Sequence, residues 1–332
     1  MLSRRSFLAA GAATLTLPLL GGCRAANTPV ATQLLTATDV HVADYPTVTA
    51  VRWIGETLAR ETGGRLGITQ YHSGQLGRES EAIDMARLGA IDITRVYAGA
   101  LNNAFPLTRA LCLPYMFDSV AHMRHALDNG VAAAVLQGFA SRDLVGLAIY
   151  DSGARNFYNT RKPIMHPQDL KGMKLRVANS DTFIEMMRLF GANPTPMSLG
   201  DTFSGMETRM IDGAENNLRS FHSSRHFEAA RYWSMSQHSW APDILLMSRR
   251  SFQALSTTDQ ELVMETARAS VQVMRQAWDA SEDKARLALI DHGIQFNEVD
   301  RDAFRAAAQP LIDHHLRDDA IGQLHKRIRA LS

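Results

Sequence analysis

Apolar residues recur along the chain with two spacings, every second residue in short runs and every three or four residues in longer ones. The longer run at 48–64 places Val51, Ile54 and Leu58 on one face and ends at two glycines, which predicts an amphipathic helix. Alternating strands and helices of such lengths are typical of βαβ units, so an α/β fold is expected. The pattern in the first third of the chain predicts five elements in this order: a strand at 33–38, the helix just described with Thr47 as its cap, a strand at 66–71, a helix at 79–88, and a third strand that the turn at 89–94 leads into.

The rest of the chain predicts a second set of helices and strands, with one helix of unusual length. Residues 257–292 contain few helix breakers and far exceed the usual helix length of about 12 residues. The remaining pattern predicts helices at 119–136, 181–190, 201–209, 301–316 and 321–331, strands at 144–150, 173–177, 211–216 and 293–299, and a break at 191–196.

Two arginines lie where strands are expected to begin or end. Arg176 belongs to the alternating sequence MKLRV at 173–177, and Arg155 follows the apolar run at 144–150. An arginine at a strand end can donate two hydrogen bonds at once to a carboxylate. The alternative is that both are surface arginines paired with an aspartate or glutamate, since charged side chains are mostly exposed.

The first 23 residues form a targeting segment, with a charged start and an apolar stretch too short for a spanning helix. The sequence SRRSFL, which contains Arg4 and Arg5, resembles the twin-arginine (Tat) export signal of bacteria. The sequence LGGC, which ends at Cys23, resembles a lipobox, in which the cysteine is lipidated. A cleaved signal with an incidental cysteine is the alternative. Export to the periplasm is expected in either case.

Composition excludes several function classes. The formal net charge of +1 gives no basic stripe or acidic tail, so no nucleic-acid partner is expected. Beyond Cys23 only Cys112 remains, which cannot form an internal disulfide and is expected in the core. No metal-binding or cofactor motif occurs, and the adjacent His314 and His315 lack the spacing of a helix-face metal pair. We therefore expect neither metal nor cofactor.

Seven motifs, taken together and in order, resemble one family. They are GQLG with a following acid (74–79), LGAIDI (88–93), LCLPYMF (111–117), DLKGMKLRV (169–177), GANPTPM (191–197), MIDGAENN (210–217) and SFQALSTTDQ (251–260). The chain is similar to the periplasmic solute-binding subunits of tripartite ATP-independent periplasmic (TRAP) transporters, of the dicarboxylate-binding DctP type. The resemblance covers nearly the whole chain after the export signal.

The resemblance implies a two-domain periplasmic binding protein of the Venus-flytrap type. Strands cross between its α/β domains, and the long helix at 257–292 spans both. The expected domain I comprises 30–153 and 242–281, and domain II comprises 154–241 and 282–332. A ligand would lie in the cleft between the domains and close it by hinge bending.

The resemblance also implies a carboxylate anchor in domain II. Arg176 aligns with the arginine that clamps the ligand carboxylate, Arg155 with a second arginine beside it, and Asn216 with an asparagine that completes the anchor. A carboxylate that enters a closing cleft loses its hydration, and charge-assisted hydrogen bonds offset that loss.

Domain I is expected to recognise the rest of the ligand. His41 follows the first strand and Glu79 begins a helix, so both can bind hydroxyl groups. The alternatives are that His41 caps nearby backbone and that Glu79 stabilises its helix through the dipole. Tyr97, Arg95 and Trp240 are further candidates, although Trp240 also suits a core position.

The ligand class is predicted less directly. The sequence from Asp39 to Thr47, D-x-H-x-x-D-Y-P-T, resembles TRAP binding proteins for hexuronates such as glucuronate and galacturonate, so a sugar acid is favoured. A C4-dicarboxylate would require a second cation in domain I, for which Arg78 or Arg95 is available. Sialate and aromatic or keto acids stay open.

The expected partners are the small and large TRAP membrane subunits, and the expected state is a monomer. A binding protein that presents its ligand to a sensor kinase is an alternative. An exported enzyme is another, because the cleft would hold an acid, a histidine and arginines. No recognisable nucleophile–base pair occurs in the sequence, so we expect a binding protein and not an enzyme.

Overall fold

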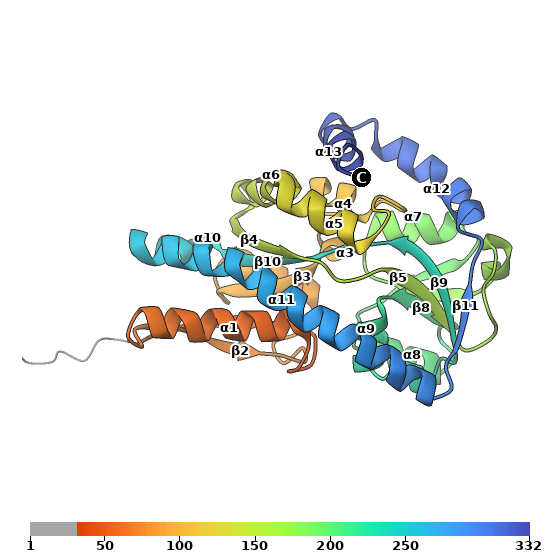
Figure 1. Cartoon of the computed structure of the whole chain (residues 1–332), viewed down its shortest axis with the longest axis horizontal. Helices are drawn as coiled ribbons and strands as arrows, with labels where there is room; N and C mark the ends of the chain where they lie inside the picture. Colours follow the sequence, from red (N-terminus) through yellow and green to blue (C-terminus); the bar gives the residue numbers. More distant parts are fainter. Residues whose placement is uncertain (1–31) are drawn as a thin grey trace, which may run out of the picture. The chain divides into compact units, whose positions relative to one another are not determined.

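Two β-sheets form the framework of this protein, for which the computed structural model describes residues 32–332. In the first sheet, β1 is parallel to β2 and β3, whereas β10 is antiparallel to β3 and β4 (Figure 1). Its order is β2 (Leu66–Tyr71), β1 (Gln33–Thr38), β3 (Ile93–Tyr97), β10 (Asp243–Ser248) and β4 (Leu144–Tyr150).

The second sheet has a similar mixture of parallel and antiparallel pairs. β6 is parallel to β7 and β8, and β5 is antiparallel to β8 and β9. Its order is β11 (Gln295–Glu298), β9 (Tyr232–Ser239), β5 (Arg155–Asn159), β8 (Gly213–Asn216), β6 (Lys174–Val177) and β7 (Asn193–Pro196).

Two continuous segments cross from one sheet to the other. β4 runs through residues 151–154 into β5, and β9 runs through residues 240–242 into β10. Gly153 lies in the first crossing with a φ of 68°, and a Cβ atom there would lie 3.0 Å from the ring of Trp278. Glycine therefore suits this position both by its conformational freedom and by its small size.

A single long helix, α11 (Thr257–Asp291), packs against elements next to both sheets. It starts where the Ser256 side chain accepts a hydrogen bond from the Asp259 N–H, and its 35 residues span about 50 Å. Along its length it contacts α1 (Pro46–Glu61), β4 and α9 (Leu218–Ser223) (Figure 1). The helix predicted at 257–292 is therefore present.

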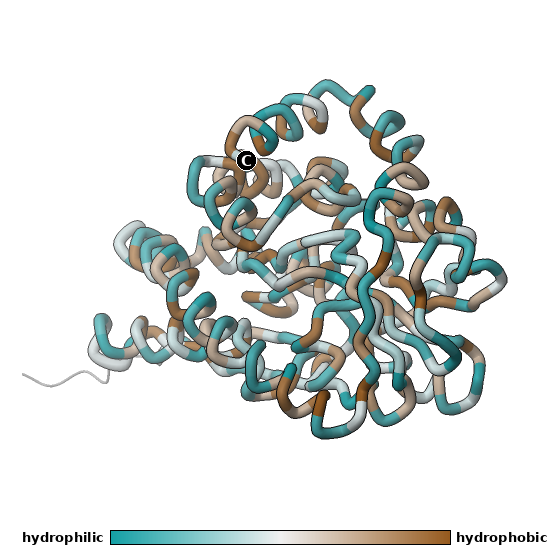
Figure 2. Tube along the Cα trace, turned by 45° about the vertical axis from the view of Figure 1, so that its right-hand side comes forward, coloured by the Kyte–Doolittle hydropathy of each residue, from teal (hydrophilic) through white to brown (hydrophobic). Residues whose placement is uncertain are grey.

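The remaining helices cover the faces of the two sheets. In Figure 2 hydrophobic and hydrophilic turns alternate along them, as expected for amphipathic helices. The α-helices are α2 (Glu79–Leu88), α3 (Ala98–Leu101), α4 (Arg109–Cys112), α5 (Val120–Ala126), α6 (Ala132–Gly138), α7 (Asp181–Leu189), α8 (Thr202–Glu207), α10 (Arg249–Gln253), α12 (Arg301–His315) and α13 (Asp319–Arg329). Shorter helical turns are η1 (Pro106–Thr108), η2 (Leu127–Val131), η3 (Phe139–Arg142), η4 (Pro167–Leu170) and η5 (His226–Glu228).

Several local predictions differ from the structure. Thr47 does not cap α1; the helix begins at Pro46, and the Thr47 hydroxyl instead donates to Asp39 at 2.7 Å. The helix predicted at 119–136 is interrupted at Asn129 and Gly130, whose backbone angles are not helical. The break predicted at 191–196 contains strand β7, and no strand was predicted for β5, β9 or β10.

The C-terminal helix α13 packs on helices that follow the first three strands. Arg329 donates to the Met116 carbonyl at 3.2 Å and to Asp118 at 3.0 Å, and His122 contacts the Ile328 carbonyl at 3.0 Å. The assignment of 282–332 to domain II, like the other domain limits, stays a prediction.

The export motif with Arg4 and Arg5 and the proposed lipidation site Cys23 lie outside the described residues. Within residues 32–332, no helix is both long and apolar enough to cross a bilayer.

Candidate ligand-binding site

A cavity lies between the two sheets, where strand ends from both converge. It is small, at about 30 Å³, and adjoins a groove of about 770 Å³ through residues that line both, among them Glu79 and Arg176. The cavity is too small for a monosaccharide, so entry of one requires the two sides to move apart. The lining residues are His41, Tyr45, Glu79, Arg95, Tyr97, Ser152, Arg155, Arg176, Ala178, Leu199, Asn216, Asn217, Ser220 and Asp243.

Arg176, on β6, is a buried guanidinium without a carboxylate partner. Its side chain donates from Nε to the Met197 carbonyl at 2.9 Å, and no carboxylate oxygen of residues 32–332 lies within 4.0 Å. The residue is only 4% exposed, and burial lowers the pKa of its guanidinium. Arginine nevertheless keeps its charge in proteins, so burial of this cation is costly, and residues 32–332 offer it no carboxylate at ion-pair distance.

Arg155, the first residue of β5, differs because it is paired. It donates to the two carboxylate oxygens of Glu215 at 2.5 and 2.9 Å, to the Glu215 carbonyl at 2.9 Å and to the Asn216 side-chain oxygen at 3.0 Å. These bonds occupy four of its five N–H groups. Burial would raise the pKa of Glu215, but Arg155 and His238 lower it to about 2. Arg155 therefore holds a buried ion pair and has one N–H group left for a ligand.

Asn216 ends β8 and has a fixed side-chain orientation. Its oxygen accepts from Arg155 at 3.0 Å and from the Asn217 backbone N–H at 2.8 Å. Because the oxygen faces two donors, the amide nitrogen is left as a donor for the cavity that Asn216 lines. β5 runs antiparallel to β8 and β6 runs parallel to β8, and this topology brings Arg155, Asn216 and Arg176 together.

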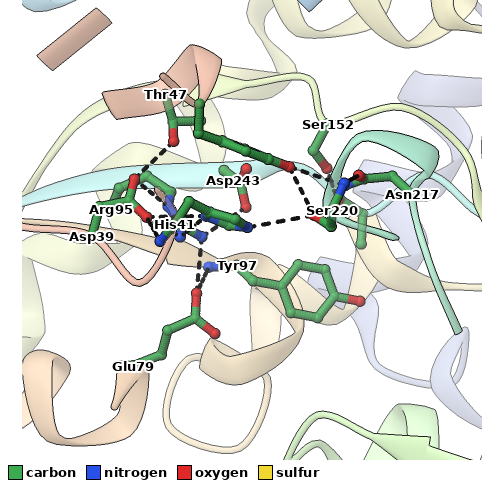
Figure 3. A network of polar contacts seen from close by, with 12 residues as sticks. Asp39, His41, Thr47, Glu79, Arg95, Tyr97, Ser152, Asn217, Ser220 and Asp243 are labelled. Atoms are coloured by element: carbon green, nitrogen blue, oxygen red, sulfur yellow. Dashed lines mark hydrogen bonds and ion pairs between the residues drawn. The ribbon is translucent and has the colours of Figure 1, made fainter. Parts of the chain in front are cut away.

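Arg95, on β3 of the first sheet, is the centre of a second polar cluster at the cavity (Figure 3). Its Nε donates to Asp39 at 3.0 Å, and its Nη1 donates to Glu79 at 2.9 Å and to Asp243 at 3.2 Å. Its Nη2 contacts Asp39 and the Nδ1 atom of His41. Four of the five N–H groups of Arg95 thus have carboxylate acceptors, and the fifth faces His41 Nδ1, which also lies 3.0 Å from Asp39 Oδ1.

Asp39 anchors this cluster and is itself saturated. Its Oδ2 accepts from Thr47 and Arg95, and its Oδ1 accepts from the His41 backbone N–H at 2.9 Å. Burial would raise the pKa of Asp39, but Arg95 and His41 hold it far below its ordinary value. Asp39 therefore positions Arg95 and His41 and has no free hydrogen-bonding capacity for a ligand.

His41 links the cluster to α9. Its ring stacks on Tyr45 with centroids 3.8 Å apart, and its Nε2 lies 3.4 Å from the Ser220 hydroxyl. The Tyr45 hydroxyl is 2.8 Å from the same serine oxygen. The loop after β1 and helix α9 thus meet at one end of the cavity through three side chains.

Two carboxyl groups of the cluster keep one oxygen each without a donor among the described residues. Glu79 uses Oε1 to accept from Arg95 and from the Tyr97 backbone N–H at 3.1 Å. Asp243, which pairs with Tyr97 in the register of β10 and β3, uses only Oδ1. Burial raises the pKa of Asp243. Glu79 Oε2 and Asp243 Oδ2 are therefore the acceptors that this side offers to hydroxyl groups.

The structure brings most of the predicted site residues to this one cavity. Arg176, Arg155, Asn216, His41 and Glu79 all line it, as do Tyr97 and Arg95, while Trp240 lies in the hydrophobic core and not in the lining. Their roles in binding stay predictions.

Several polar residues around the cavity were not predicted as site residues. Asp39 and Tyr45 lie within the D-x-H-x-x-D-Y-P-T sequence that pointed to hexuronates, so a signal for them existed. Asp243 begins β10, a strand that the pattern did not predict, and hence had none. Ser152, Asn217 and Ser220 complete the set.

The chain matches known proteins over most of its length. Residues 38–319 match the family model described as bacterial extracellular solute-binding protein, family 7 (DctP). The uncharacterized protein YiiZ of Salmonella typhimurium is 35% identical over 286 residues, which cover 86% of this chain and 88% of that protein.

Solved structures of TRAP periplasmic solute-binding proteins are also similar. One from Xanthobacter autotrophicus, with bound β-D-galacturonate, is 43% identical at a TM-score of 0.87 and covers 89% of this chain and 99% of its own. One from Bradyrhizobium, with bound galacturonate, is 42% identical at a TM-score of 0.88, and the match covers 90% of this chain and 100% of that chain. One from Roseobacter denitrificans, with β-D-glucuronate, is 34% identical at 0.87 and covers 90% and 99%.

These similarities confirm the two-domain periplasmic binding protein fold and the predicted resemblance to TRAP solute-binding proteins. The relatives are binding proteins and not enzymes, which removes the exported enzyme as an alternative. The chain belongs to the bacterial extracellular solute-binding proteins of family 7, the DctP-type binding proteins of TRAP transporters.

Proposed function

We propose that this protein captures a sugar acid of the hexuronate type and delivers it to the small and large membrane subunits of a TRAP transporter. The observation that carries the proposal is Arg176, a buried cation that lines the cavity and has no carboxylate of residues 32–332 within 4.0 Å. A ligand carboxylate supplies that counterion through a two-pronged hydrogen bond. The free amide nitrogen of Asn216 and the remaining N–H group of Arg155 complete the anchor.

The rest of the cavity supports a ligand rich in hydroxyl groups. Glu79 Oε2 and Asp243 Oδ2 accept hydrogen bonds, and Tyr45, Ser152 and Ser220 contribute neutral hydroxyls. Three similar proteins hold galacturonate or glucuronate, each a sugar with one carboxylate. A hexuronate fits this division between one cationic side and one side of hydroxyl acceptors.

A C4-dicarboxylate is less well supported, because neither candidate for a second cation is available. Arg95 is fully buried, with four of its N–H groups bonded to carboxylates and the fifth facing His41. Arg78 lines only the outer groove, where its exposed side chain pairs with Asp201 at 3.2 Å.

The test of the anchor is a series at Arg176, measured by calorimetric titration with D-galacturonate and D-glucuronate. Charge-assisted hydrogen bonds contribute about 1.5–3 kcal/mol each, so Arg176→Met should weaken binding at least a hundredfold. Arg176→Lys keeps the positive charge but cannot donate the two parallel hydrogen bonds, so its affinity should lie between those of the wild type and Arg176→Met. Without ligand, the Met variant should be no less stable than wild type, because it removes a buried unpaired charge.

The matched control is Arg188→Met, on the exposed side of α7, where binding should be unchanged. Retained uronate affinity in Arg176→Met would refute the anchor. Absence of binding by the wild type to every uronate would refute the ligand class.

We further infer that the signal containing Arg4 and Arg5 exports the chain to the periplasm, where a lipid on Cys23 anchors it to the membrane. The protein is expected to be a monomer there. Replacement of Cys23 by Ser should move the protein from the membrane fraction to the soluble periplasmic fraction. Cys112→Ala is the control, since that thiol is buried and should leave fractionation unchanged. A wild type already found in the soluble fraction would contradict the anchor.

A further inference from the structure

The side of the cavity around Arg95 carries an excess of negative charge. There, one guanidinium, that of Arg95, faces three carboxyl groups, those of Asp39, Glu79 and Asp243. The raised pKa of Asp243 is the expected response of a buried carboxyl group in such surroundings.

This side can therefore accept hydrogen bonds but cannot neutralise an anion. The N–H groups of Arg95 are directed at the protein's own groups, four at carboxylate oxygens and one at His41 Nδ1, and its side chain is fully buried. Among the carboxylate oxygens of this side, Glu79 Oε2 and Asp243 Oδ2 are left for a ligand, and both require a donor. A hydroxyl group can donate to them, whereas a carboxylate cannot, and like charges placed together cost several kcal/mol at a binding interface.

We propose that Glu79 and Asp243 form an acid filter, which admits acids with one carboxylate and a hydroxyl-bearing body and rejects diacids of the same chain length. The filter rests on the proposed anchor: once Arg176 holds one carboxylate, the far end of the ligand meets these two groups. Its effect is on selectivity, because a diacid is excluded by charge and not by size.

Matched ligands isolate the charge. Galactonate and galactarate have the same open six-carbon chain but carry one and two carboxylates, respectively. The ratio of their affinities therefore measures the effect of the filter, and the affinity for D-galacturonate measures the effect of the Arg176 anchor. In the wild type, galactonate should bind at least a hundredfold more tightly than galactarate. Glu79→Gln and Asp243→Asn should each reduce that ratio at least tenfold, mainly through tighter binding of galactarate.

Both substitutions keep the protein's internal hydrogen bonds, because an amide oxygen still accepts from Arg95 and, for Glu79, from the Tyr97 N–H. Glu56→Gln makes the same chemical change at an exposed site on α1 outside the cavity lining and should leave the ratio unchanged. Calorimetric titration at constant pH and salt measures all three.

The outcomes separate the two proposals. If D-galacturonate binds but the ratio is unchanged in both cavity variants, or if galactarate binds the wild type as tightly as galactonate, the filter is wrong and the anchor stands. If neither open-chain acid binds any variant, shape excludes the diacid and the filter is also wrong. If the wild type binds no uronate at all, the proposed function fails first.

Discussion

At the scale of single residues, two arginines of the same cavity have different electrostatic surroundings. Arg155 is neutralised by Glu215, whereas Arg176 has no described carboxylate within 4.0 Å. The resemblance to the family predicted both as ligand-binding residues, because both align with arginines of its carboxylate anchor. It could not separate their roles, because the partner Glu215 is 60 residues from Arg155 along the chain.

The pairing of Arg155 with Glu215 predicts a stability defect in Glu215→Gln. Loss of the carboxylate leaves a buried guanidinium without its counterion, which typically costs about 3–5 kcal/mol. Urea unfolding at pH 7 should show this loss in free energy of unfolding, while Glu56→Gln should show none.

The same defect should depend on pH. The pKa of Glu215 is about 2 in the folded protein against an ordinary 4.5, so its stabilisation is fully present above pH 4.5 and is lost as the pH falls towards 2. The difference in free energy of unfolding between wild type and Glu215→Gln should therefore become smaller below pH 4.5. A gap that stays constant down to pH 3 would show that the ion pair does not stabilise the fold.

At the scale of elements, periodicity predicted the helices better than the strands of the crossing segments, of which only β4 was predicted. α11 has long runs without breakers and was predicted almost residue for residue. β10, with the sequence DILLMS, is buried at every position between β3 and β4, so it lacks the apolar–polar alternation that identifies a strand with one exposed face. β5 and β9 belong to the same crossing segments and were also missed.

This gap limited what could be predicted about the site. The residues that the family motifs contain, such as Arg176, Asn216, His41 and Glu79, were found from sequence. Asp243 was not, because it is the first residue of β10 and reaches the cavity only through the antiparallel pairing of β10 with β3. A contact made by long-range strand pairing leaves no local pattern in the sequence.

At the scale of the whole molecule, we expect the two sides of the cavity to separate and close on binding, with the chain bending in the crossing segments. In the first crossing, Asp151 is held by Arg124 at 2.8 Å and by Arg275 of α11 at 3.0 Å. Two residues later, Gly153 has positive φ and packs against Trp278 of the same helix. This segment therefore combines a fixed point on α11 with a residue of high backbone freedom.

We expect Gly153→Ala to weaken ligand binding by acting on the closed conformation. An alanine at positive φ costs roughly 1–2 kcal/mol, and its Cβ would crowd the Trp278 ring at 3.0 Å. If the backbone at position 153 leaves positive φ when the cavity opens, the substitution destabilises only the closed form. The population of the closed, binding-competent form then falls about tenfold, and the apparent affinity falls by the same factor. Stopped-flow and calorimetric titrations with D-galacturonate should show faster dissociation at a nearly unchanged association rate.

Gly293→Ala is the matched control, because Gly293 has a similar φ of 76° with open space around it and lies outside both crossings. This variant should lose stability without losing affinity. Equal affinity in the two variants would place the hinge elsewhere in the chain.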